Sequence, residues 1–157
     1  MQKITPCLWF DGQAEEAANF YISVFKNGSI EQTSYYGEEG FKIHQRPIGS
    51  VMTVIFKING QKYMALNGGP QFKFNEAISF IINCDTQEEI DYFWEHLSSG
   101  GEEGPCGWLK DKFGISWQIV PTVLDQLMQN TATSGKVMNA LLNMKKLNIA
   151  TLKAAAE

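Results

Sequence analysis

Two short stretches of this sequence repeat one pattern at an offset of 73 residues. Residues 14–21 read AEEAANFY and residues 87–94 read QEEIDYFW, and in each a Glu-Glu pair precedes two neighbouring aromatic residues. A repeat at a fixed offset indicates that a structural unit has been duplicated. The 157 residues suit one domain or two small packed halves. The chain is therefore expected to contain two similar units.

The first copy reads as a strand, a helix and three further strands. Apolar residues recur at helical spacing between Ala14 and Phe25. Asn59-Gly60 lies between two apolar runs and predicts a two-residue hairpin turn, since both central positions of such a turn need positive φ. The predicted elements are a strand at 4–10, a helix at 13–25, a strand at 29–36, a loop at 37–50, and strands at 51–58 and 61–66.

The second copy repeats this order and is followed by a tail. Four apolar residues lie on one face of its helix, namely Ile90, Phe93, Trp94 and Leu97. Gly114 predicts a tight turn between the last two strands, because glycine adopts a left-handed conformation without strain. The predicted elements are a strand at 76–84, a helix at 86–98, a loop up to 105, strands at 106–111 and 115–121, and a helical tail at 122–157.

These elements predict an α+β fold with two βαβββ modules and a C-terminal helical tail. We place the first module at 1–70, the second at 71–121 and the tail at 122–157. Val137, Leu141 and Met144 form an apolar stripe on the tail. This stripe needs to be buried, either on its own module or on a second chain.

Composition excludes several classes of partner. The net charge is −4 and no cluster of Lys and Arg is present, which argues against binding to a nucleic-acid backbone. No apolar run approaches the ~20 residues that a membrane span needs, and the first residues lack the apolar stretch of a signal peptide. Three widely spaced cysteines favour reduced thiols in a cytoplasmic protein.

Three long segments carry a family resemblance. PCLWFDGQAEEAANFYISVF, KYMALNGGPQFKFNEAISF and CGWLKDKFGISWQIVP, in this order, resemble the PhnB-like branch of the vicinal oxygen chelate superfamily, and KVMNALLNMKKLNI in the tail extends the likeness. That superfamily includes glyoxalase I, bleomycin-resistance proteins and extradiol dioxygenases. The resemblance implies two βαβββ modules whose curved sheets surround a shared cavity, and it implies a homodimer.

Some members of this branch carry the label 3-demethylubiquinone 3-methyltransferase. A methyltransferase of the Rossmann type needs a parallel sheet and a Gly-rich first βα turn around its cofactor. The present sequence has no G-x-G-x-x-G, and turn formation explains the glycines of NGG and SGG. The sequence therefore argues against methyl transfer of that type.

The resemblance also locates the positions that hold a metal in metal-dependent members. These positions lie on the first and last strand of each module and correspond to Pro6, Ala65, Ser79 and Gln118. Of the four, Gln118 alone is a plausible ligand, whereas a divalent site needs three or more protein donors. A shift of one residue offers Cys7 or Asn83, which still builds no site. We expect no metal and no cofactor.

A semi-enclosed cavity that binds a small molecule remains the expected site. If Gln118 faces it, strand alternation directs Ser116 the same way and buries Trp117. Trp108 is either a cavity wall or part of the core. The predicted lining residues are Leu8, Phe10, Tyr63, Ala65, Ser79, Trp108, Ser116 and Gln118.

The sequence is compatible with two functions. The first is metal-free binding or sequestration of a small molecule, favoured by the missing ligand set and the missing acid–base pair. The second is a metal-independent isomerase, lyase or transferase, with Cys106, His44 or Asp111 as the reacting group. The fold supports both classes and does not choose between them.

Overall fold

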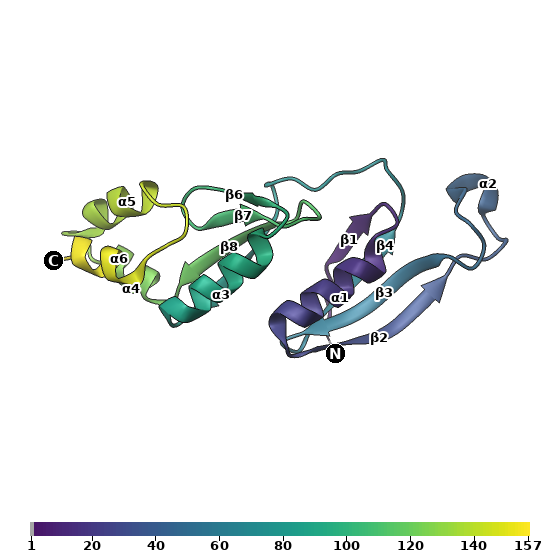
Figure 1. Ribbon diagram of the computed structural model, residues 1–157, viewed down its shortest axis with the longest axis horizontal. Coiled ribbons are helices and arrows are strands. Elements are labelled where there is room, and N and C mark those ends of the chain that lie inside the picture. The colour runs from purple at the N-terminus through teal and green to yellow at the C-terminus, as the bar shows by residue number, and fades with distance from the viewer. Residues whose placement is uncertain (1) are drawn as a thin grey trace. The chain divides into compact units, whose positions relative to one another are not determined.

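The computed structural model describes residues 2–157 and divides them into two compact units. The division falls between Lys73 and Phe74, and the C-terminal tail belongs to the second unit. Each unit contains a four-stranded mixed sheet with one long helix along one face (Figure 1). The predicted α+β class is confirmed. The predicted shared cavity stays a prediction.

The first unit has the predicted order of one strand, one helix and three strands. Its sheet has the order β1-β4-β3-β2, in which β1 and β4 are parallel and the other pairs are antiparallel. Its elements are β1 (Cys7–Phe10), α1 (Ala14–Phe25), β2 (Gly28–Tyr35), α2 (Phe41–His44), β3 (Val51–Ile58) and β4 (Gln61–Asn67). The predicted loop at 37–50 thus contains one short helix.

The core of the first unit lies between α1 and its sheet. Small residues on α1, such as Ala14 and Ala17, are fully buried and let the helix approach the strands closely. The rings of Tyr21 on α1 and Phe56 on β3 stack with centroids 6.2 Å apart. Val54 and Ile58 are buried on the same side of β3 as Phe56, as strand alternation requires.

The hairpin turn between β3 and β4 is confirmed. Asn59 has φ 48° and Gly60 has φ 79°, so both central residues are left-handed. This turn twists in the same sense as the strands that it connects.

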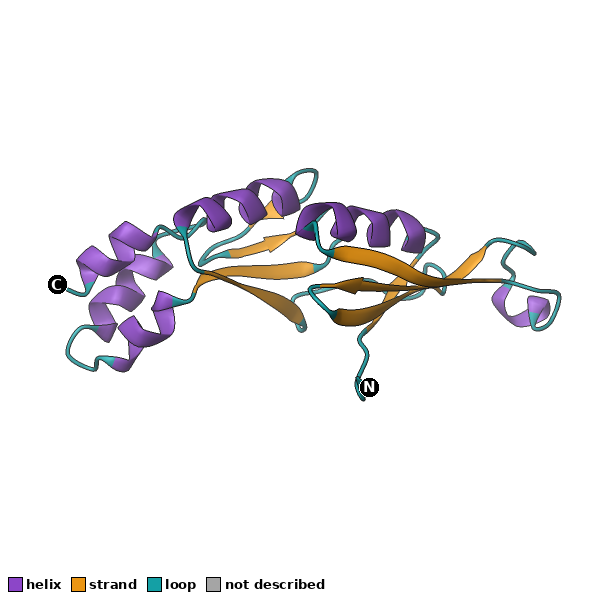
Figure 2. Cartoon of the chain, turned by 90° about the horizontal axis from the view of Figure 1, so that it is seen from below, coloured by secondary structure: helices purple, strands orange, loops and turns teal. Residues whose placement is uncertain are grey.

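The second unit repeats the topology with the strand order β5-β8-β7-β6, and again its first and last strands are parallel. Figure 2 shows its long helix lying along one face of the sheet. The elements are β5 (Ser79–Cys84), α3 (Gln87–Ser98), β6 (Glu102–Glu103), β7 (Trp108–Lys110), β8 (Ser116–Pro121), α4 (Val123–Gln129), α5 (Ser134–Leu142) and α6 (Ile149–Ala155). The duplication inferred from the sequence is present in the topology.

Three predicted elements differ in detail. The first strand begins at Cys7 rather than at residue 4, because Pro6 has no N–H to donate to a ladder. The strand predicted from residue 76 begins at Ser79. Cys106 does not open a strand but lies in a turn, with φ 58°, followed by Gly107 with φ 83°.

The tail forms three short helices around a small core of its own. Val137, Leu147 and Leu152 are buried together, and Leu141 and Met144 pack against them. The apolar stripe is thus largely covered within one chain, while Leu142 stays exposed. No helix among residues 2–157 is long and apolar enough to cross a membrane.

Candidate functional site

The helix α3 covers one face of the second sheet but not the other. Buried strand residues such as Ile82, Leu109, Trp117 and Ile119 alternate with less buried ones along the strands. Since successive side chains point to opposite faces, the strand residues between these core residues lie on the face away from α3. That face carries Ser79, Ile81, Asn83, Trp108, Lys110, Ser116, Gln118 and Val120.

The strand register groups four of the predicted site residues on this face. Ser116 lies opposite Ser79, and Gln118 lies opposite Trp108. The amide Nε2 of Gln118 donates a hydrogen bond of 2.8 Å to the Ser79 hydroxyl. The structure therefore brings Ser79, Trp108, Ser116 and Gln118 together, and it buries Trp117 as predicted.

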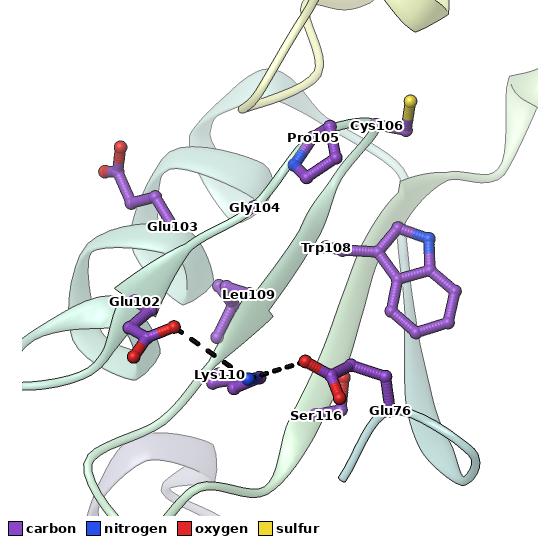
Figure 3. Close-up of a pocket in the computed structure, with 10 residues that line it drawn as sticks. All are labelled: Glu76, Glu102, Glu103, Gly104, Pro105, Cys106, Trp108, Leu109, Lys110 and Ser116. Carbon is purple, nitrogen blue, oxygen red and sulfur yellow. Dashed lines mark ion pairs between the residues drawn. The ribbon is translucent and has the colours of Figure 1, made fainter.

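A pocket of about 450 Å³ lies on the same sheet. Its apolar wall includes the indole of Trp108 and the ring of Pro105. Polar groups lie at intervals around this wall, so the pocket combines an aromatic surface with a few hydrogen-bonding groups (Figure 3). The polar lining residues are Glu76, Glu102, Glu103, Lys110 and Ser116, and Cys106 also belongs to the lining.

Lys110 is the one cation in this lining and is ion-paired. Its Nζ lies 2.5 Å from Glu76 Oε1 and 3.9 Å from Glu102 Oε2, so the ammonium sits between two carboxylates (Figure 3). Hydrogen bonding to Glu76, and then the charge of that carboxylate, raises the pKa of Lys110. The same hydrogen bond lowers the pKa of Glu76. Lys110 and Glu76 are therefore both charged at neutral pH.

Cys106 enters the pocket from a tight turn between β6 and β7. Trp108 N donates to Pro105 O at 3.0 Å, which closes the turn around Cys106 and Gly107. The Gly107 carbonyl accepts a hydrogen bond of 2.8 Å from Ile119 N, so the turn is anchored to β8. Cys106 is half-buried, and no cation among the pocket residues hydrogen-bonds to its sulfur.

Asp111 serves the turn that follows it. The residue is 2% exposed. One carboxylate oxygen accepts hydrogen bonds from Phe113 N at 2.9 Å and Ile115 N at 3.1 Å, and the other accepts one from the Trp117 indole at 2.8 Å. This geometry fixes the DKFG turn and packs Trp117, which is a structural role.

His44 belongs to the first unit, whereas the pocket lies in the second. Its ring lies 4.5 Å from that of Tyr36, and its Nδ1 accepts a hydrogen bond of 2.9 Å from Arg46 N. Its Nε2 lies 3.2 Å from the backbone oxygen of Glu39, and these contacts order the 37–50 segment.

The remaining predicted lining residues face α1. Leu8, Phe10 and Ala65 are buried, and Ala65 pairs with both Leu8 and Val54 in the core. The ring of Tyr63 stacks on that of Phe56, with centroids 5.5 Å apart. Burial raises the pKa of Tyr63. These four residues form the helix-facing side of the first sheet, so their burial does not support direct contact with a ligand.

One extra residue explains this placement. Phe10 ends β1 and pairs with Asn67, and Cys84 occupies the same place at the end of β5, where it pairs with Pro121. The segment between this residue and the next helix is one residue longer in the first unit than in the second. The helices therefore repeat at an offset of 73 residues and the first strands at 74. This alignment places Thr5 at the position of Ser79 and Met64 at that of Gln118. The four residues of the first strand, CLWF, show no apolar–polar alternation, so the sequence held no signal for this register.

The corrected register still builds no metal-ligand set. Thr5, Met64, Ser79 and Gln118 offer two hydroxyls, a thioether and an amide. Across residues 2–157, no three His, Cys, Asp or Glu side chains are grouped closely enough to hold a metal ion. The chemistry of the donors does not fit the carboxylate and imidazole sets that bind divalent cations.

Comparison with known proteins agrees with this architecture. The sequence matches, over residues 2–120, the family described as 3-demethylubiquinone-9 3-methyltransferase. The PhnB protein from Bacillus cereus is 37% identical, with 77% of this chain and 100% of that chain covered and a TM-score of 0.66. No curated protein matches the sequence significantly.

More distant structures share the fold. PA1353 from Pseudomonas aeruginosa is 20% identical, with 77% of this chain and 98% of that one covered and a TM-score of 0.60. The fosfomycin resistance protein FosX from Listeria monocytogenes, in complex with Mn(II) and sulfate, is 20% identical, with 81% and 99% covered and a TM-score of 0.52. FosX is a member of the vicinal oxygen chelate superfamily.

The fold also bears on the family's description. Within residues 2–157 the two sheets are mixed and four-stranded, and each has one parallel pair. This differs from the doubly wound parallel sheet of Rossmann-type methyltransferases. The matched residues, the PhnB likeness and the duplicated βαβββ topology agree, so the chain belongs to the PhnB-like family described as 3-demethylubiquinone-9 3-methyltransferase.

Proposed function

We propose that the protein binds a small molecule in the pocket of its second unit, without a metal ion and without turnover. The observation that carries this proposal is the pocket itself, about 450 Å³ in volume, with the Trp108 indole as a wall. Ligand sites are typically concave and mostly apolar, have volumes of roughly 300–1,000 Å³, and contain a few polar groups that orient the ligand.

The lining favours a compact ligand with a planar apolar part. An indole offers a flat apolar surface, and stacked aromatic pairs gain about 0.5–1.5 kcal/mol beyond area burial. The Ser116 hydroxyl in the lining can hydrogen-bond a polar substituent. Ser79 and Gln118, which hydrogen-bond to each other on the same sheet face, lie outside the lining. Lys110 is already paired with Glu76 and Glu102, so a ligand needs no net charge to enter.

The alternative is a metal-independent isomerase, lyase or transferase at the same pocket. Of its three candidate groups, Asp111 is occupied by three donors and His44 belongs to the other unit. Cys106 is the remaining group, and catalysis would need its thiolate. Within residues 2–157 no Lys, Arg or His donates a hydrogen bond to that sulfur to favour a thiolate, so binding is the stronger proposal.

The wider proposal retains a homodimer in the cytoplasm, with no cofactor and no nucleic-acid or membrane partner. Cys7, Cys84 and Cys106 are free thiols, which suits a reducing compartment. Exposed apolar side chains in both units offer surface that a second chain could cover.

Native mass spectrometry of the untagged protein as purified tests ligand binding. We expect a retained small molecule, and we expect the Trp108→Leu variant to retain at least tenfold less of it. Phe72→Leu is the matched control, since it removes an exposed aromatic ring in the first unit and should retain the molecule fully. Equal retention by Trp108→Leu, or no retained molecule and no binding from a metabolite library, would contradict the proposal.

Elemental analysis of the same sample tests the metal-free part. The donor set at Thr5, Met64, Ser79 and Gln118 leads us to expect much less than one Zn, Ni, Mn or Fe per chain. A stoichiometric transition metal that survives dialysis would refute this part while leaving the pocket in place.

A further inference from the structure

The turn that carries Cys106 into the pocket is held from outside the sheet by the tail. Cys106 N donates to Met144 O and Gly107 N donates to Lys145 O, each at 2.8 Å. In an isolated hairpin turn these two N–H groups would point to solvent. Here they bind residues 144–147, a segment between α5 and α6 that we call the strap.

The strap is fixed at its other side to α3. The side chain of Gln87 donates to Leu147 O at 3.1 Å and accepts from Ile149 N at 2.9 Å. Lys146 Nζ lies 2.7 Å from Asp91 Oδ1, which is one turn further along α3. The strap therefore links the helix layer of the second unit to the pocket turn.

Packing reinforces these hydrogen bonds. Leu147 is 1% exposed and belongs to the core of the tail. A Cβ added at Gly107 would lie 3.1 Å from Leu147 and 2.8 Å from the Ile119 carbonyl oxygen. The turn is thus enclosed between the strap and β8, with no room to shift toward either.

The turn also needs such support. A non-glycine residue in the left-handed region costs about 1–2 kcal/mol, and Cys106 occupies that region. A strained turn relaxes unless its surroundings hold it. The pocket wall from Pro105 to Trp108 would move with it, because these residues flank the same turn.

We infer that the strap is the positioning element of the pocket, so that the tail sets the shape of the binding site through the Cys106–Gly107 turn. The strap lies outside residues 2–120, the part of the chain that matches the family model. The claim that the turn shapes a binding site rests on the proposed function, whereas the claim that the strap holds the turn does not.

The test uses the full chain with Gln87→Leu, which removes the hydrogen bond from α3 to Leu147 in the strap and the one to Ile149 just after it. Gln126→Leu is the matched control, since Gln126 is an exposed glutamine on α4. The first readout is amide hydrogen exchange at Cys106 and Gly107. We expect this exchange to be at least tenfold faster in Gln87→Leu than in the wild-type protein, and unchanged in Gln126→Leu. Lys146→Ala, which removes the ion pair with Asp91, should act in the same direction and serves if Gln87→Leu does not fold.

The second readout is binding of 8-anilinonaphthalene-1-sulfonate, a planar probe, with Trp108→Leu defining the pocket-bound part. We expect the Trp108-dependent binding of the probe to be at least threefold weaker in Gln87→Leu, while the circular dichroism spectrum stays the same as that of the wild-type protein. Unchanged exchange at both amides would overturn the inference. Faster exchange with unchanged probe affinity would overturn the link between strap and pocket. If the wild-type protein shows no Trp108-dependent binding of this probe or of any library compound, the proposed function fails, and the exchange data still decide whether the strap holds the turn.

Discussion

At the scale of single residues, the backbone conformation of Gly60 is the clearest constraint. Its φ of 79° is left-handed, and a Cβ at this position would meet no atom within 4 Å. Strain in the backbone is then the only penalty for a side chain here. Gly135 on α5 also has open space around a Cβ, but its φ is not left-handed.

We therefore predict that Gly60→Ala lowers the free energy of unfolding by about 1 kcal/mol. Gly135→Ala should leave it unchanged or raise it by up to roughly 1 kcal/mol, because alanine favours a helix. Chemical denaturation followed by circular dichroism measures both. Equal effects of the two substitutions would show that the turn is not left-handed at residue 60.

The three thiols differ in their surroundings. Cys84 is fully buried beneath α3, while Cys7 is exposed and Cys106 is half-buried. Burial, and then the charges of Glu89 and Asp85, raises the pKa of Cys84 to about 12. A raised thiol pKa means that the unreactive protonated form persists to higher pH.

At pH 8 we accordingly expect two thiols per native chain to react with Ellman's reagent and the third only after unfolding. A pKa near 12 leaves roughly one Cys84 in ten thousand as thiolate at that pH. Cys84→Ala should give the same count in the native protein and one thiol fewer in denaturant. Three rapidly reacting thiols in the native wild-type protein would disprove the burial of Cys84.

At the scale of elements, the two long helices begin in different ways. Thr86 and Glu89 form a capping box at the start of α3, with Glu89 N donating to the Thr86 hydroxyl. Gln13 makes no side-chain cap at α1. Instead Asn67, at the end of β4, accepts a hydrogen bond of 2.9 Å from Ala14 N.

Asn67 also ties other segments to this helix start. Its Nδ2 donates to Val51 O at 3.0 Å, and its backbone carbonyl accepts from the Tyr36 hydroxyl at 2.6 Å. Asn67 thus replaces a local cap at α1. It joins the start of this helix to the sheet and to Tyr36 and Val51, the two residues that flank the 37–50 segment. No sequence signal near residue 13 shows it.

This difference predicts the order of two substitutions. Asn67→Ala should cost about 2–4 kcal/mol of stability, because it leaves the buried Ala14 N–H and the partly buried Val51 carbonyl without their partner. Thr86→Ala should cost about 1 kcal/mol, as is typical for the loss of an N-cap. Denaturation midpoints of the two variants provide the measurement, and a larger loss from Thr86→Ala would contradict the role of Asn67.

At the scale of the whole molecule, apolar surface remains uncovered in each unit. Ile43 is 90% exposed and Phe72 64% exposed in the first unit, and Ile78 is 76% exposed in the second. Each open sheet also leaves two edge strands, β1 and β2 in one and β5 and β6 in the other. Exposed edges and apolar patches invite pairing with another chain.

We predict a homodimer, since a closed two-fold interface is the commonest way for a chain to cover such surface. Light scattering at micromolar concentration should give twice the 17.6 kDa of one chain. The substitution Ile43→Lys should weaken the dimer if the 37–50 segment contributes to it, and Leu142→Lys on α5 tests the tail in the same way. A mass of one chain across the concentration range would rule the dimer out.

The sequence alone determined the duplication, the α+β class, the Asn59-Gly60 turn and the common sheet face of Ser116 and Gln118, whereas it left the face of Trp108 open. These features depend on local periodicity and turn chemistry, which neighbouring residues set. The ion pair of Lys110 with Glu76 could not be predicted in this way, because the two residues are far apart in the chain.

Only the tertiary structure decided which side of the first sheet each residue takes. The side chains of a strand alternate with a period of two, so one extra residue between β1 and α1 directs Leu8, Phe10 and Ala65 into the core rather than toward a ligand. Only the fold placed Asn67 at the start of α1 and the strap beside Cys106. Such contacts join segments distant in sequence, and their energy depends on the packing of the complete unit rather than on any local pattern.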